Sequence, residues 1–379
     1  MNRTDTVKKI PWWTPQIGDK EIAFIRQALK RHYVNEGELA NALENKIAAM
    51  LGAKYAVSAT SGTAAIFLAL KGLGIGPGDE VVVPDITFIA TANAVEMCGA
   101  RPVLADVDAD TLNISIDAFA QAITGSTRAV VPVHVSGRAA AMDGITAMAE
   151  KKGIVVVEDA AEAFMSKHKG KFLGTFAAAG CFSFSPNKTI TTGQGGMIVT
   201  DDEKLRTRLR ELKDQGRPVR GTGGADRHDV IGYNFKFTDI QAALGLGQLS
   251  YLASRLERMK AIYQRYSQRL AALEGIRIFR FDIEGAEAPQ WTDAIAEDRE
   301  GLLEYLSGQG IDCRRYWFPL HTQKPYKLPD DGFPNSAYLS PKALWLPSAF
   351  TMTDPDVDRV CDHIKSYYKS KRKRKDAAA

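Results

Sequence analysis

The sequence predicts an α/β protein in which a mostly parallel central sheet, covered by helices on both faces, is followed by a smaller C-terminal α/β domain. Strand-like runs alternate with helical stretches over about the first 200 residues, as in parallel sheets built with crossover helices. After residue 234 the pattern changes to a long helical region. The chain has 379 residues, of which 45% are hydrophobic and 25% charged. This length allows a large core and a second lobe, and the composition excludes a disordered or fibrous protein.

The elements follow in order along the chain. A turn of small residues at 58–63 precedes an apolar helix predicted at 64–70. Apolar runs predict strands at residues 81–83, 103–107, 129–135, 154–158, 181–185 and 197–200, and a helix is predicted at 142–152. Apolar side chains at helical spacing then indicate one long or kinked helical region over residues 239–273. We place a domain boundary inside it, which gives a large domain of residues 1–250 with an N-terminal arm and a small domain of residues 251–379 with a basic tail.

Charge, cysteines and hydropathy restrict the classes of protein that fit. The N-terminus lacks the apolar core of a secretion signal, and no window reaches the roughly 18 apolar residues of a membrane span. We therefore expect a cytoplasmic protein that does not contact a membrane. Most of the net charge of +4 comes from the tail at 369–375, which we interpret as a solvated, frayed terminus and not as a nucleic-acid site. The four cysteines show no paired spacing, so we expect neither disulfides nor a metal site.

Two charged residues stand where strands are predicted to end. Asp159 follows the strand at 154–158, and Lys188 lies between the strand at 181–185 and a glycine-rich turn at 193–196. A lysine placed this way can be desolvated and become nucleophilic, which suits it to form a Schiff base. A carboxylate at Asp159 can pair with the protonated ring nitrogen of a pyridine cofactor such as pyridoxal phosphate. The ordinary alternatives are a solvated surface charge for Lys188 and a helix N-cap for Asp159.

The same part of the chain offers places for a phosphate and a flat ring. Gly62 and Thr63 stand at the start of the predicted helix at 64–70, where free backbone amides favour an anion. An ordinary capped helix explains this turn as well. Phe88 follows the strand at 81–83 and could stack on a cofactor ring, although core packing explains many such residues.

Five segments occur in a fixed order: SGT at 61–63, DITF at 85–88, EDAAEA at 158–163, FSFSPNKTITTG at 182–193 and GYNFK at 232–236. Together they resemble the DegT/DnrJ/EryC1/StrS family of sugar aminotransferases over nearly the whole chain. The resemblance implies a pyridoxal-phosphate enzyme of fold type I, similar to aspartate aminotransferase. Such an enzyme moves an amino group, usually from L-glutamate, to the keto carbon of a nucleotide-linked sugar.

Matching positions assign the family's cofactor contacts to residues of this chain. Lys188 matches the lysine that binds the cofactor covalently and Asp159 the partner of the pyridine nitrogen. Phe88 matches the aromatic side chain that stacks on the ring. The residues that match phosphate contacts are Gly62, Thr63 and Ser183.

Two further positions bear on assembly and on the sugar. Asn234 matches a residue that reaches the phosphate of the neighbouring subunit, which implies a homodimer with shared active sites. Glu162 stands where many members carry His or Gln under the ring. Its segment resembles the branch that includes GDP-perosamine synthases, in which a nucleotide-linked 4-keto-6-deoxy sugar is aminated. The departures from that branch are Ser185, Pro186, Gln194 and Lys236.

Candidates for substrate contacts come from the segment at 314–321. Arg314, Tyr316 and His321 match a family segment that lines the sugar site, and a cationic wall there suits a sugar phosphate. A surface strand that enters a proline turn is an equally ordinary interpretation. Trp12 and Trp13 could form a docking arm across a dimer interface or pack on their own chain.

Three functions from different classes fit the resemblance to different degrees. The first is the sugar aminotransferase, whose product would serve surface polysaccharide, such as lipopolysaccharide, or other amino-sugar biosynthesis. The second is a pyridoxal-phosphate sugar dehydratase of the same family, whose members carry His at the position of Lys188. The third is a regulatory protein that binds the cofactor without turnover. The lysine, the acid and the phosphate turn occur together, which favours the aminotransferase.

Overall fold

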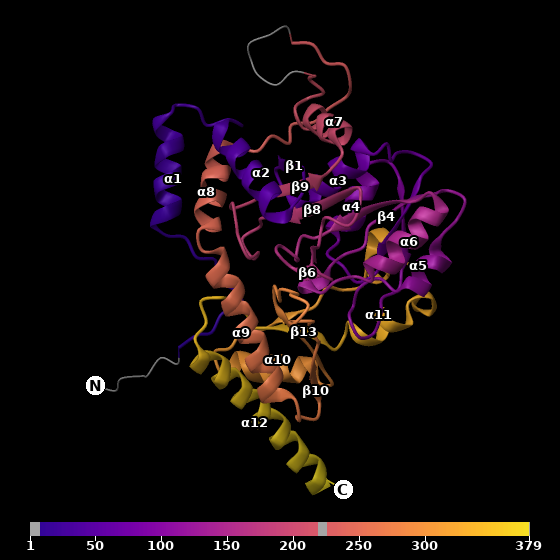
Figure 1. The fold of residues 1–379 in the computed structure, drawn as a ribbon. Helices are drawn as coiled ribbons and strands as arrows, with labels where there is room; N and C mark the ends of the chain where they lie inside the picture. The colour runs from indigo at the N-terminus through magenta and orange to yellow at the C-terminus, as the bar shows by residue number, and fades with distance from the viewer. Residues whose placement is uncertain (1–7, 219–225, 379) are drawn as a thin grey trace.

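The computed structural model describes residues 8–218 and 226–378 and contains a seven-stranded sheet in its N-terminal part (Figure 1). The strand order is β1-β9-β8-β5-β4-β2-β3. Neighbours from β8 to β3 run parallel, and β9 is antiparallel to both β1 and β8. The mostly parallel sheet is thus confirmed. Its strands are β1 (Tyr55–Ala59), β2 (Glu80–Pro84), β3 (Arg101–Ala105), β4 (Thr127–Val130), β5 (Val155–Asp159), β8 (Ala179–Ser183) and β9 (Gly196–Thr200).

Helices cover both faces of this sheet. Along β2, Val81 and Val83 pack in one apolar cluster and Val82 packs in another, because successive side chains of a strand point to opposite faces. One face carries α3 (Gly62–Gly72), α4 (Ala90–Met97) and α7 (Glu203–Lys213). The other face carries α2 (Glu38–Leu51), α5 (Ile116–Ala122), α6 (Met142–Lys152) and α8 (Asp239–Leu249). Burial on both sides explains why the strands read as continuous apolar runs.

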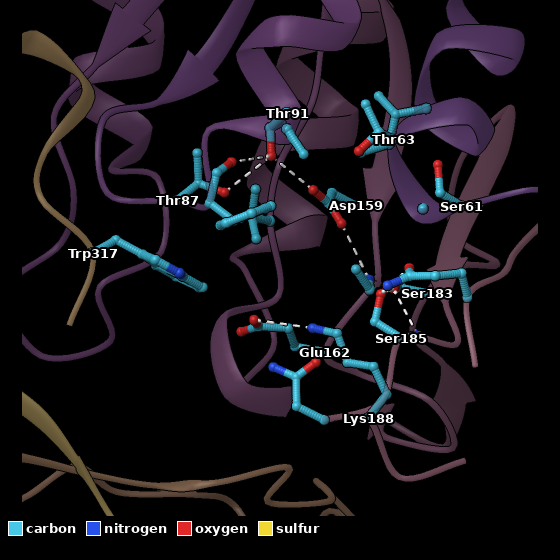
Figure 2. A pocket seen from close by; sticks show the side chains of 18 of the residues that line it. Ser61, Thr63, Thr87, Thr91, Asp159, Glu162, Ser183, Ser185, Lys188 and Trp317 are labelled. Carbon is cyan, nitrogen blue, oxygen red and sulfur yellow. Dashed lines mark hydrogen bonds and ion pairs between the residues drawn. The ribbon is translucent and has the colours of Figure 1, made fainter. Parts of the chain in front are cut away.

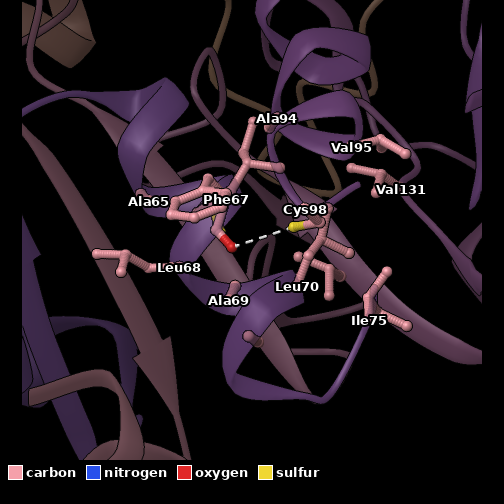
Figure 3. Close-up of a cluster of buried hydrophobic side chains, with 14 of the residues drawn as sticks. Ala65, Phe67, Leu68, Ala69, Leu70, Ile75, Ala94, Val95, Cys98 and Val131 are labelled. Carbon is pink, nitrogen blue, oxygen red and sulfur yellow. Dashed lines mark hydrogen bonds between the residues drawn. The ribbon is translucent and has the colours of Figure 1, made fainter. Parts of the chain in front are cut away.

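The packing between α3 and α4 holds the start of α3 in place (Figure 3). Phe67, Ala94 and Val95 are buried there, and the Cys98 thiol donates to the Phe67 carbonyl oxygen at 3.7 Å. Burial raises the pKa of Cys98 to about 12. All four cysteines are free thiols, and Cys98 serves as a small apolar core residue.

The C-terminal part forms a second, smaller α/β unit around an antiparallel sheet of order β10-β11-β13-β12. The long helix α9 runs from the large sheet into this unit and packs beside the C-terminal helix (Figure 1). Its strands are β10 (Ile276–Ile278), β11 (Thr292–Ala296), β12 (Arg314–Arg315) and β13 (Ala343–Leu346). Its helices are α9 (Leu252–Leu270), α10 (Arg299–Gly308), α11 (Pro334–Leu339) and α12 (Asp354–Ala378).

The remaining elements lie at the edges. Helix α1 (Asp19–Lys30) packs along α8, and β6 (Lys167–His168) pairs with β7 (Lys171–Phe172). The N-terminal arm contacts the small unit at two places. Ile10 forms a parallel β-bridge with Ile311, and the Trp13 ring packs on Phe350 with 5.3 Å between the ring centroids. The division of the chain at residue 250 stays a prediction. Within the described residues, no helix combines the length and the apolarity that a bilayer span requires.

The helical region expected at 239–273 takes its kinked form, with an interruption at residues 250–251 between α8 and α9. Two local features differ from the sequence-based expectations. Strand β4 ends at Val130 and not at 135, because Pro132 has no amide hydrogen to continue the ladder. The segment at 369–375 lies inside α12 and does not follow it, and Lys371 pairs with Asp298.

A buried ion pair joins the two units. The Arg138 guanidinium lies 2.5 Å from the Asp293 carboxylate of β11, and both side chains are almost fully buried. Asp293 also accepts a hydrogen bond of 2.8 Å from the Ser136 hydroxyl. A buried charge that loses its partner is costly, so this pair fixes how residues 136–138 meet β11.

We predict that Arg138→Met lowers the free energy of unfolding by about 3–5 kcal/mol, because it leaves the Asp293 carboxylate buried and unpaired. Urea unfolding of the protein, followed by circular dichroism, measures the loss. Arg315→Met is the matched control, since it breaks the exposed Arg315–Glu300 pair, which should be worth at most about 1 kcal/mol. Equal losses for both variants would contradict the proposed role of the buried pair.

Candidate active site

A cavity of about 300 Å³ opens where the parallel strands end, between the large sheet and the small unit. This is the edge at which α/β sheets bind ligands. The start of α3, the loop after β2, the end of β5 and the loop after β8 supply its walls, and the small unit closes it with Trp291, Arg314 and Trp317.

The fold brings most of the predicted site residues together in this cavity. The residues that line it are Gly62, Thr63, Phe88, Asp159, Glu162, Ser183, Lys188 and Arg314. Three predicted residues do not line it, namely Asn234, Tyr316 and His321.

Lys188 projects into the cavity from the loop between β8 and β9 (Figure 2). Its Nζ lies 3.3 Å from Oε1 of Glu162 and 4.8 Å from the centre of the Trp291 ring. Gln290 of the small unit holds the loop, because its side-chain oxygen accepts the Thr189 hydroxyl at 2.8 Å and its nitrogen donates to the Asn187 carbonyl at 3.1 Å. Lys188 is thus a paired, enclosed amine and not a solvated surface charge.

Glu162 connects the lysine to the buried ion pair. Its second oxygen accepts the Ser136 amide at 2.9 Å, and the Ser136 hydroxyl donates to Asp293. Burial raises the pKa of Glu162, and the charge of Lys188 and the Ser136 amide oppose that rise. Ser136 adopts φ 54°, a strained conformation for a residue with a side chain, which turns its amide toward Glu162.

Asp159 ends β5 and is 5% exposed. One oxygen accepts the Thr91 hydroxyl at 2.8 Å and the other accepts the Ala161 amide at 3.1 Å. Burial raises the pKa of Asp159, and these two hydrogen bonds offset part of that rise. The carboxylate therefore caps the following turn and also faces the cavity, so the two interpretations of this residue are compatible.

Glu158, the preceding residue, points to the opposite face of the sheet. Its carboxylate accepts the amides of Gly174, Phe176 and Ala177 and contacts a ring nitrogen of His134 at 3.0 Å. The hydrogen bonds of Glu158 therefore fix the loop at 174–177. Of this acidic pair, Asp159 alone lines the cavity.

The opposite end of the cavity is a cradle of amides and hydroxyls. The Ser61 hydroxyl oxygen caps α3 by accepting the Ala64 amide at 3.1 Å. The amides of Gly62 and Thr63 lie at the helix start, where backbone amides have no carbonyl partner within the helix. A Cβ on Gly62 would lie 2.9 Å from the Ser183 Cβ, and one on Gly196 only 2.2 Å from the Ser61 carbonyl. Glycine at both positions lets the turn approach β8 and β9. The side chains at this end are Ser61, Thr63, Ser183, Ser185 and Gln194.

Phe88 forms a side wall of the cavity and is 54% exposed. Core packing therefore does not account for it, and a face of its ring is free for a flat partner. Nearby, the Thr87 and Thr91 hydroxyls are 3.0 Å apart, which links the Phe88 loop to the Thr91–Asp159 contact (Figure 2).

The three residues outside the cavity have different surroundings. The Tyr316 hydroxyl donates to Asp293 at 3.1 Å, and Tyr316 lines a neighbouring groove. His321 is fully buried, with Asp85 at 2.6 Å and Asp330 at 3.2 Å from its two ring nitrogens. Asn234 is exposed and pairs through its backbone with Asp214.

Sequence reasoning missed several residues of the site. Thr91 holds Asp159, Trp291 lies under Lys188, and Ser136 positions Glu162. The spacing of Thr87 and Thr91 by one helical turn was a usable local signal. Trp291 carries no such signal, because only the packing of the small unit brings it to the cavity. Ser136 carries none either, because it acts from the turn at 135–137 through its backbone amide. Trp12 and Trp13 pack within the chain, at 5.4 Å and 6.5 Å from the Trp291 ring.

The cavity offers the groups that pyridoxal phosphate requires. An enclosed amine can bind the aldehyde, a buried carboxylate can pair with the ring nitrogen, and a helix start with glycine at its close approach can receive the phosphate. We found no arrangement of three or more metal-ligating side chains within residues 8–218 and 226–378.

Comparisons with known proteins agree with this geometry. A GDP-perosamine synthase of Escherichia coli O157:H7 is 36% identical over 370 residues, which span 96% of this chain and all of that protein. The solved pyridoxal-phosphate form of the putative sugar aminotransferase Spr1654 from Streptococcus pneumoniae superposes with a TM-score of 0.91 at 28% identity, covering 96% of this chain and 99% of that one. DesI, solved with its TDP-sugar product, gives a TM-score of 0.89 at 28% identity, covering 98% and 96%.

The family model that describes the DegT/DnrJ/EryC1/StrS aminotransferases matches residues 15–365. Fold, cofactor and reaction class therefore agree with the expectations from sequence. The chain belongs to the DegT/DnrJ/EryC1/StrS aminotransferase family and is a pyridoxal-phosphate-dependent sugar aminotransferase.

Proposed function

We propose that this enzyme transfers the amino group of L-glutamate to a nucleotide-linked 4-keto-6-deoxy sugar, as a GDP-perosamine synthase does. The observation that carries the proposal is the enclosed Lys188 amine in one cavity with the buried Asp159 carboxylate and the α3 phosphate cradle. The related GDP-perosamine synthase and the DesI structure with a TDP-sugar support a nucleotide sugar as the acceptor. We place the enzyme in the cytoplasm, where its product would feed surface polysaccharide, such as lipopolysaccharide, or other amino-sugar biosynthesis.

Each side chain has a defined task in this reaction. Pyridoxal phosphate, when bound, supplies an electron sink for the pair of electrons left behind when the α proton of the donor is removed. The Lys188 amine would hold the cofactor and, when released by the donor, would be the base that takes and returns this proton. Asp159 would pair with the ring nitrogen and keep it protonated. Glu162 keeps the amine oriented through its 3.3 Å contact.

The cradle supports the proposal of a homodimer with shared sites. The side chains of the cradle are neutral, and the described cationic residues that line the cavity are Lys188 and Arg314. A doubly charged phosphate in the cradle would therefore have room for further polar contacts, which a second chain could add. Asn234 is exposed on this chain, and Ile231 beside it is 85% exposed. Exposed apolar side chains also occur on and after α1, at Ile22, Leu29, Tyr33 and Val34. An association that covers these side chains would bring Asn234 to a neighbouring subunit.

The proposed function is tested with the purified enzyme, reconstituted with pyridoxal phosphate. We expect L-glutamate to convert the visible band of the bound cofactor to that of its aminated form, and a keto sugar nucleotide to restore it. Lys188→Ala should keep its circular-dichroism spectrum but lose this response, because the covalent attachment and the base are both removed. Borohydride reduction followed by peptide mass measurement should place the cofactor on Lys188 in the unaltered enzyme. Full turnover by Lys188→Ala would refute the mechanism.

We predict that Asp159→Asn weakens cofactor binding roughly tenfold or more and slows the proton transfer, because an amide does not provide the charge that holds the ring nitrogen protonated. Equilibrium titration with pyridoxal phosphate and stopped-flow absorbance with L-glutamate measure the two effects. Thr91→Val is the control, since it removes one hydrogen bond from Asp159 but keeps the carboxylate, and it should cost less. The assignment fails if Asp159→Asn keeps the affinity and the rate of the unaltered enzyme.

Shared sites predict complementation between two inactive variants. Light scattering should give about twice the chain mass of 41.4 kDa. Asn234→Asp should weaken cofactor binding enough to abolish activity, because it places a carboxylate near the partner's phosphate. Mixed with Lys188→Ala and reassembled, it should regain one working site per mixed dimer, where an intact Lys188 meets an intact Asn234. If the mixture stays inactive while both variants assemble, Asn234 does not act across the interface.

A further inference from the structure

Arg314 is the arginine in the described lining of the cavity, and no carboxylate of the described residues pairs with it. It lies on β12, lines the cavity and is half-buried. Its guanidinium carbon lies 4.9 Å from the centre of the Trp12 ring and 5.4 Å from that of Trp345. In the described part of the chain, no Asp or Glu lies within ion-pair distance of Arg314, and its side chain has no hydrogen-bond partner there.

The neighbouring arginines are satisfied within the protein. Arg138 pairs with Asp293, and Arg315 pairs with Glu300 on the surface. Arg255 donates to the Thr189 carbonyl and to the side chain of Gln248. A guanidinium withdrawn from water without an anion is costly, and burial lowers the pKa of Arg314 while the more distant charge of Glu162 opposes this. Arg314 therefore has a place for an anion that the described residues do not supply.

The position of Arg314 separates it from the phosphate end of the cavity. The cradle is built by α3, β8 and the loop after β8, whereas Arg314 comes from the small unit on the side of Lys188. Lys188 and Arg314 both contact the tryptophan group, Lys188 at Trp291 and Arg314 at Trp12, and these two rings lie 5.4 Å apart. Glu162, whose carboxylate lies 3.3 Å from Nζ of Lys188, also acts electrostatically on Arg314. An anion bound by Arg314 is thus received at the Lys188 end of the cavity.

The chemistry of the two substrates then distinguishes between their anions. An amino-acid donor carries a carboxylate on the carbon atom that bears its amine, so its charge must arrive next to Lys188. A keto sugar has no charge beside its reacting carbonyl, and its diphosphate lies across the sugar ring. Lys188 is already paired with Glu162, which leaves Arg314 as the remaining cation of the described cavity lining.

We propose that Arg314 is the receptor for a carboxylate of the amino donor, and that its planar fork selects amino acids over simple amines. The proposal rests on the aminotransferase function described above. Two parallel N–H donors match the two oxygens of a carboxylate, and the rings of Trp12 and Trp345 hold the guanidinium in place by cation–π contact. Arg314 acts in the first half of the reaction, in which the donor is consumed.

A binding experiment tests the receptor without turnover. Glutarate carries the two carboxylates of glutamate but no amine, so it cannot react. Calorimetry with the reconstituted enzyme should show glutarate binding that weakens roughly tenfold to a hundredfold in Arg314→Gln, as expected for loss of a charged hydrogen-bonded contact. Arg314→Lys should fall between, because it keeps the charge but loses the fork. Arg315→Gln, an adjacent exposed arginine, is the matched control and should bind glutarate like the unaltered enzyme.

Kinetics of the separate half-reactions give a second readout. In Arg314→Gln the concentration of L-glutamate needed for half-maximal conversion of the cofactor band should rise by a similar factor, with a smaller change in the limiting rate. The return reaction with a keto sugar nucleotide should be nearly unchanged. Circular dichroism and the cofactor spectrum check that each variant is folded and loaded, and Arg314→Lys keeps the test valid if the glutamine variant does not fold.

A comparison of glutarate with pyrophosphate distinguishes a carboxylate receptor from a diphosphate receptor. If Arg314→Gln weakens binding of pyrophosphate and not of glutarate, the anion is the sugar diphosphate and the proposal is overturned. It is also overturned if neither ligand is affected. If the unaltered enzyme binds glutarate through Arg314 but does not react with L-glutamate, the choice of donor in the proposed function fails and the carboxylate receptor stands.

Discussion

The structure depends on the compensation of charges that are buried between its two units. Glu162 and Asp293 both lie inside the protein, and each needs a cation and donors to remain there. Lys188 compensates Glu162, Arg138 compensates Asp293, and Ser136 bonds to both carboxylates, through its amide and its hydroxyl. This chain of contacts couples the reactive lysine to the junction between the units.

The same constraint explains why the site is assembled from distant parts of the chain. The parallel strands end at one edge and deliver Asp159 and the loop of Lys188 there. The small unit then encloses the edge with rings, so that all five tryptophans, Trp12, Trp13, Trp291, Trp317 and Trp345, form one aromatic group. Enclosure by rings keeps water away from the amine, which strengthens its electrostatic contacts. Each charged side chain in this enclosed region then needs a group of opposite charge, and Arg314 has no carboxylate partner among the described residues.

The two ends of the cavity therefore serve different purposes. At the α3 end, amides and hydroxyls present neutral donors, which suits an anion such as a phosphate. At the other end, Lys188 lies over Trp291 and Arg314 lies over Trp12. Because Arg314 has no carboxylate partner among the described residues, it can bind and release the anion of a substrate. A ping-pong reaction needs this second property, since donor and acceptor use one space in succession.

The sequence by itself determined the fold class, because its strand and helix patterns are local. Asp159 and Lys188 at predicted strand ends indicated a pyridine cofactor, and the resemblance of five segments to the family supplied the reaction class. A parallel sheet brings strand ends to one edge whatever the details of the loops. Tertiary structure alone decided that Trp291, Ser136 and Thr91 complete the site, that Tyr316 and His321 lie outside the cavity, and that Arg314 is left unpaired among the described residues. These outcomes depend on contacts between segments that are brought together only by folding: Thr91 and Asp159 are 68 positions apart, and Ser136 and Asp293 are 157 positions apart. No local pattern in the sequence records such contacts.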